Sequence, residues 1–199
     1  MHALVPWLLM VPFAAPAAGA EEPRWALTVE LPRTVQIGGV GLLSVVSRST
    51  FLLRGSLDDA QVQRCELYAD SPLARAVAAP VRDRDTRLRF TAAGPARVDD
   101  AASLMPAEPV RFSLVVPMVG TFEVIATVAG RLALEGRRQR DALAGSAVVH
   151  DSRERIDGPA FFDMSFPDGG PVHGSFRVVP TGARSCAELI AEGRRGGGR

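Results

Sequence analysis

The chain has 199 residues, of which 47% are apolar, 23% are charged and 6% are aromatic, and its 23 basic residues nearly balance its 22 acidic ones. This composition excludes an intrinsically disordered protein and is typical of a globular one. A net charge of +1 gives no electrostatic reason to expect nucleic acid or an anionic membrane surface as the partner.

The first 20 residues have the features of a secretory signal peptide. They form an apolar stretch without Asp, Glu, Lys or Arg that ends in Ala18-Gly19-Ala20, the small-x-small pattern that signal peptidase accepts. Three prolines interrupt the stretch, which makes a membrane-anchoring helix the less favoured alternative. We therefore expect cleavage of residues 1–20, a periplasmic or extracellular mature protein, and no transmembrane segment in that mature protein.

The first part of the mature chain alternates apolar and polar residues with the period of a half-buried strand. Residues 25–31 place Trp25, Leu27, Val29 and Leu31 on one face. Further strands are predicted at residues 42–46, 51–53 and 62–68.

Residues 70–109 have a different texture, with five prolines between many Ala and Asp residues. Proline and aspartate favour turns over strand interiors. We interpret this region as long inter-strand connections that contain one strand at residues 87–91 and a short helix at residues 73–79.

The strongest strand signals lie at residues 110–116 and 121–128. The four residues between them are too few for anything but a tight connection, so we predict an antiparallel hairpin. Its inward residues should form the centre of the core: Phe112, Leu114, Phe122, Val124 and Ala126. Replacement of Phe122 by Ala should then cost about 3–5 kcal/mol.

The C-terminal third contains further short strands bounded by turns. These are predicted at residues 132–134, 147–150, 160–166 and 175–179. The polar run at residues 136–141 is interpreted as an exposed loop, and residues 186–192 as one or two helical turns. We expect a single domain over residues 21–192, with two small β domains as the alternative, and a disordered tail over residues 193–199.

Cys65 and Cys186 are the only cysteines of the chain. An oxidising compartment favours their pairing, so we expect one disulfide that ties the C-terminal segment to an early strand. Two buried free thiols are the alternative. The sequence contains no CxxC motif, which argues against a zinc or redox site built on sulfur.

Short strands without alternating long helices predict an all-β fold. The stretch Val29-Glu30-Leu31-Pro32, followed by Gly38 and by residues 43–46, resembles the opening strands of bacterial immunoglobulin-like and fibronectin type III-like domains. Residues 120–126 are similar to the penultimate strand of those domains, with Phe122 at the position where a Tyr often makes the corner. The resemblance implies an antiparallel immunoglobulin-like β-sandwich with long connecting loops and at most short helices.

Candidate catalytic and metal-binding residues are scarce. After signal cleavage only His150 and His173 remain as imidazoles, and neither belongs to a serine-hydrolase or HExxH motif. Asp151 or Asp163 could complete a zinc site, and the Asp-Gly turns could bind calcium, although such residues are more often plain turn formers. We therefore expect no cofactor and no enzymatic activity.

The expected function is binding of a protein, a glycan or a cell-envelope component by a non-catalytic domain. A small extracellular hydrolase or metal-dependent enzyme is the alternative. The candidate binding residues are Phe161 and the basic cluster of Arg137, Arg138 and Arg140. Strand alternation places Phe161 on the face opposite its aromatic neighbours, and an exposed Phe surrounded by Arg is typical of an interface anchor.

Overall fold

The structure is a computed structural model. The residues that it describes are 21–37, 41–70, 75–78, 86–91, 95–98, 100–105, 109–116, 118–158, 164–165 and 170–196.

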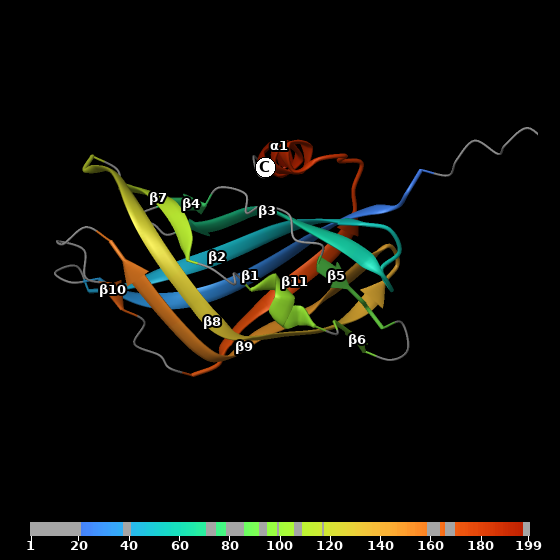
Figure 1. Cartoon of the computed structure of the whole chain (residues 1–199), viewed down its shortest axis with the longest axis horizontal. Helices are drawn as coiled ribbons and strands as arrows, with labels where there is room; N and C mark the ends of the chain where they lie inside the picture. Colours follow the sequence, from blue (N-terminus) through green and yellow to red (C-terminus); the bar gives the residue numbers. More distant parts are fainter. Residues whose placement is uncertain are drawn as a thin grey trace, which may run out of the picture.

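Strands dominate the described part of the chain (Figure 1). The strands are β1 (Arg24–Ile37), β2 (Gly41–Arg54), β3 (Ala60–Asp70), β4 (Arg75–Ala78), β5 (Thr86–Leu88), β6 (Ala96–Arg97), β7 (Val110–Val116), β8 (Gly120–Gln139), β9 (Ala142–Asp157), β10 (Met164–Ser165) and β11 (Val172–Pro180). The helices are the 3-10 helix η1 (Ala101–Leu104) and the α-helix α1 (Cys186–Gly196).

The strands pair antiparallel and belong to one sheet. Its main part, β3-β2-β1-β11-β9-β8, is curled into a half-barrel, as Figure 1 shows. At one end of the half-barrel, β4 pairs with β3, β7 pairs with β8, and β4 and β7 pair with each other, so that they connect β3 to β8. At the other end β5 pairs with β3, and β6 pairs with β8. At the first end the pairings therefore lead from β8 through β7, β4, β3 and β2 back to β1. At the other end the segments that follow β5 and β6 are joined by the isolated bridge of Phe90 with Val98.

The all-β class and the restriction to short helices are confirmed for the described residues. The immunoglobulin-like sandwich is not confirmed, because the main sheet curls on itself and the strands do not separate into two sheets. Two bulges contribute to this shape: the register shifts between Thr50 and Phe51 on β2, and between Ala129 and Arg131 on β8. A bulge bends its strand and increases the local twist.

The concave face of the half-barrel holds the largest of three hydrophobic clusters, which we call the main core. It combines residues of β1, β2, β9 and β11 with residues of β5, β6 and η1 that cover the concave face. Phe51, Leu27 and Val178 are fully buried there. From η1, Ala101 and Leu104 pack into the same cluster.

The hairpin predicted at residues 110–128 is confirmed by pairing of Val110 with Ala126 and of Phe112 with Val124. Its inward residues form a second, smaller group, the hairpin cluster, with partly buried Leu67, Val116 and Phe122 around it. The prediction that this hairpin forms the centre of the core is therefore wrong. The long strands β1, β2, β9 and β11 bring more apolar side chains together than one hairpin can.

Strands β8 and β9 are longer than the sequence suggested, because two glycines interpreted as turn residues lie inside β8. Gly130 lies at the bulge, where a Cβ atom would come within 2.8 Å of the Val149 side chain. A Cβ atom on Gly136 would lie 2.8 Å from the Phe176 ring. Both glycines allow close packing, and the expected loop at residues 136–141 is instead the end of β8 and a tight turn into β9.

The short helix expected at residues 73–79 is not observed, since residues 75–78 form β4 between β3 and β7. Tertiary pairing here outweighs the helical preference of the alanines. At the C-terminus, the expected helical turns are confirmed as α1. This helix continues to Gly196, into the segment expected to be a disordered tail, and its last turn carries Arg194 and Arg195, which are favourable next to the helix C-terminal dipole.

Candidate functional site

Helix α1 lies on the convex face of the sheet, above β3 in the view of Figure 1, and is attached to it by a disulfide. The predicted bond between Cys65 and Cys186 is confirmed, with the two Cα atoms 4.9 Å apart. Cys65 is fully buried, together with Ala26, Leu52 and the helix residue Leu189. We call this group the helix platform; both cysteines of the chain are engaged in its disulfide.

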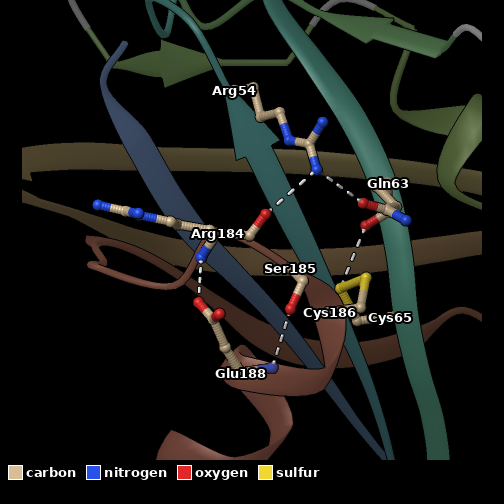
Figure 2. Close-up of a disulfide and its surroundings, with 7 residues drawn as sticks. All are labelled: Arg54, Gln63, Cys65, Arg184, Ser185, Cys186 and Glu188. Carbon is tan, nitrogen blue, oxygen red and sulfur yellow. Dashed lines mark hydrogen bonds between the residues drawn. A yellow bond between two sulfur atoms is a disulfide. The ribbon is translucent and has the colours of Figure 1, made fainter. Parts of the chain in front are cut away.

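Polar contacts fix the start of α1 next to the disulfide (Figure 2). The backbone N–H of Glu188 donates to Ser185 Oγ at 3.3 Å, and the Glu188 carboxylate accepts a hydrogen bond from the backbone N–H of Arg184 at 2.7 Å. This arrangement is close to a capping box, which the sequence Ser185-x-x-Glu188 encodes. Arg54 Nη2 donates to the carbonyl oxygen of Arg184 at 3.4 Å, which ties the helix start to β2.

Two arginines lie on the concave side of the sheet. Arg64 on β3 stacks over the Phe51 ring, with its guanidinium carbon 5.6 Å from the ring centroid, and donates to the carbonyl oxygen of Leu104. Arg33 on β1 has the same parity as the buried Leu31 and Val35. Burial lowers the pKa of Arg33 to about 10, so that it remains charged at neutral pH. Arg64 thus holds η1 against β3 and closes the concave side.

The predicted basic cluster is not a single patch. Arg137 and Arg138 are exposed near the end of β8, pair with Ala144 and Leu143 respectively, and therefore point to opposite faces of the sheet. Arg140 is exposed in the turn that follows. Phe161 lies outside the described residues. The combined basic and aromatic anchor expected from the sequence therefore remains a prediction.

The histidines predicted as possible ligands come close together. Val148 pairs with His173, and Val149 with Val172, so His150 occupies the diagonal position relative to His173 on neighbouring strands. Both have the parity of the outward residues of β9 and β11. Among the described residues, no group of three or more His, Cys, Asp or Glu side chains could hold a metal ion. Asp163, one proposed third ligand, lies outside that part of the chain, as does the Asp-Gly turn at Asp168-Gly169.

A feature that the sequence analysis missed lies at the N-terminal end of β8. The large apolar side chains that the described residues expose are Leu42, Val46, Val115, Met118 and Val119. We call Val46, Val115, Met118 and Val119 the apolar end; Leu42 lies four residues before Val46 on β2 and pairs with Gln36 of β1. Cross-strand pairing places Val46, Asp70, Arg75 and Val115 in one row across β2, β3, β4 and β7. Met118 and Val119 form the turn between β7 and β8 that adjoins this row.

Met118 is the most unusual residue of the apolar end. Its φ angle is 63°, in the left-handed region that favours glycine or asparagine, and its side chain is fully exposed at 106%. Methionine gives no conformational advantage at this φ angle, and its exposed side chain contributes nothing to the packing of the core. The signal was present in the sequence as Pro117-Met118-Val119-Gly120, a hairpin turn with two apolar residues where polar ones are the rule.

No family model, curated protein or solved structure matches the chain. The described residues contain no helix with the length and apolar character that crossing a membrane requires. The geometry of the chain is therefore the basis for the functional argument.

Proposed function

We propose that the protein is an exported, non-catalytic β domain that binds a partner protein through its apolar end. The observation that carries the proposal is Met118, which combines a left-handed backbone with a fully exposed apolar side chain. Residues that combine an unfavourable backbone conformation with no compensating packing concentrate at functional sites. Contact with a partner supplies the burial that this side chain lacks in the isolated chain.

The chemistry of the apolar end favours a protein over a glycan or a lipid surface. Its exposed members are aliphatic or methionine side chains, whereas glycans stack on aromatic rings and bilayer interfaces favour Trp and Tyr. Arg111 on β7 and Glu123 on β8 form an exposed ion pair at 3.6 Å further along the same hairpin. Apolar residues beside charges of both signs are typical of a protein interface with a polar rim.

Two observations support export and a stable extracellular form. The disulfide joins Cys65 and Cys186, and such bonds persist in oxidising compartments. The apolar sequence of residues 1–20 ends in a signal-peptidase pattern. Mass spectrometry of the exported protein should find a chain that begins at Glu21, and a mature chain that still begins at Met1 would contradict export with cleavage.

The binding proposal is tested with two variants that each place asparagine at a position with a left-handed backbone. Met118→Asn removes the apolar side chain but suits the left-handed conformation. Arg140→Asn is the matched control. It also places asparagine at a left-handed position, in the turn at the other end of β8, where Arg140 has a φ of 53°. A photoreactive side chain at position 119 should crosslink to one partner in the native envelope, which is then identified and purified.

Calorimetry with that purified partner should show an affinity loss of more than about tenfold for Met118→Asn and no loss for Arg140→Asn. A loss confined to Arg140→Asn would move the interface to the basic cluster. Flotation of the wild-type protein with vesicles, or dimerisation that Met118→Asn abolishes, would replace the partner protein by a lipid surface or a second copy, and either result would contradict the proposal.

A further inference from the structure

The chain contains three histidines, at positions 2, 150 and 173, and the fold brings the last two together. They are well separated in the sequence but lie on β9 and β11, which are hydrogen-bonded neighbours in the middle of the main sheet. This proximity is a product of the strand register alone.

The two imidazoles project from the same face. His173 stands directly opposite Val148, and His150 lies two residues further along β9 than Val148. Side chains at alternate positions of a strand share a face, so His150 and His173 form a diagonal cross-strand pair. Diagonal Cα atoms in antiparallel sheets are about 7–8 Å apart. Two imidazole nitrogens can then meet one ion at the metal–nitrogen distance of about 2.0–2.1 Å.

The surroundings leave this face open to solvent. His173 is exposed and His150 is half-buried, and the outward positions further along the two strands carry Ser146 and Ser175, which are both exposed. Arg131 on β8 stands directly opposite His150. The described residues offer no group of three His, Cys, Asp or Glu side chains, so the proposed site rests on the two imidazoles.

We propose that His150 and His173 form a two-histidine site for a divalent transition-metal ion of the copper, nickel and zinc class. Neutral imidazole suits these ions, and copper(II) binds most tightly among them. The paired strands hold both ligands on a rigid support: a Cβ atom on Gly174, next to His173, would collide with the carbonyl oxygen of Glu30, which shows how closely β11 packs on β1.

The test uses the mature chain from Glu21 without an affinity tag and copper(II) chloride as the only probe. His150→Gln and His173→Gln each remove one ligand, and Ala144→Gln is the matched control, because it places the same glutamine at an exposed outward position of β9, six residues from His150. Calorimetry should show one copper equivalent for the wild type and for Ala144→Gln. Each of the other two variants should lose more than about tenfold in affinity.

Electron paramagnetic resonance supplies a second measurement that a change in folding does not imitate. The wild-type spectrum should report two equatorial nitrogen ligands, and the spectra of His150→Gln and His173→Gln one each. Arg131→Ala should strengthen binding by about two- to threefold, because it removes a positive charge opposite the site. Unchanged affinity and nitrogen count in His150→Gln or His173→Gln, or loss of binding in Ala144→Gln, would overturn the proposal.

Discussion

The two ends of β8 meet the same backbone requirement with opposite side chains. At its N-terminal end Met118 has a φ of 63°, and at its C-terminal end Arg140 has a φ of 53°. The second turn is basic and solvated, next to the well-packed main core. The first is apolar and adjoins the smaller hairpin cluster. The difference indicates that one end of the molecule serves stability, while the other retains an apolar surface that stability does not require.

The largest expected effect tests the main core. Phe51→Ala should lower the free energy of unfolding by about 3–5 kcal/mol, because the ring is fully buried and also carries the Arg64 guanidinium. Phe122→Ala, in the half-buried margin of the hairpin cluster, should cost about 1–2 kcal/mol. Urea unfolding of both variants measures the difference. Equal losses would show that the two ends contribute equally to stability.

The disulfide belongs to the same stable end. Replacing both Cys65 and Cys186 by Ala should cost about 2–5 kcal/mol, since the bond restricts a denatured chain over a separation of 121 residues. Thermal unfolding with and without reductant should reproduce the loss in the wild type only. Because the helix platform is remote in the sheet from the turn at Met118, partner binding at the apolar end should survive in the folded variant.

The two turns themselves provide a smaller effect. Met118→Asn and Arg140→Asn should each stabilise the fold by up to about 1 kcal/mol, because asparagine tolerates the left-handed conformation better than the native residue. Chemical unfolding is again the measurement. Destabilisation by Met118→Asn would mean that the methionine side chain packs against the fold, which would remove the basis for proposing it as a contact residue.

The smallest expected effect is a loss of stability at acidic pH that comes from the Glu21 carboxyl group near α1. Hydrogen bonding to Arg24 lowers the pKa of Glu21 from its ordinary value of 4.5, helped by the charges of Arg24 and Arg184. A lowered folded-state pKa contributes stability that is present above pH 4.5 and is lost as the pH falls through the folded-state pKa. NMR titration of the Glu21 carboxyl should show a midpoint below 4.5, and in Arg24→Ala the midpoint should move back towards 4.5.

Local patterns in the sequence predicted most of the long strands and the hairpin at residues 110–128, but not β4, where a helix was expected. Alternation assigned Phe112 and Val124 to the same side, and elimination assigned the disulfide. The lengths of β8 and β9 were not predictable, because Gly136 resembles a turn residue until the Phe176 ring that packs on it is placed. The diagonal pair of His150 and His173 depends on register between distant segments, which no local pattern contains.

The sheet can be completed only after β11 has been synthesised. β11 lies between β1 and β9, so the first and the later strands gain their shared neighbour only when residues 172–180 are available. A chain that stops at residue 171 retains two unpaired strand edges, and unpaired edges recruit other chains. Truncation of the final segment should therefore cause aggregation during synthesis, before any loss of binding could be observed.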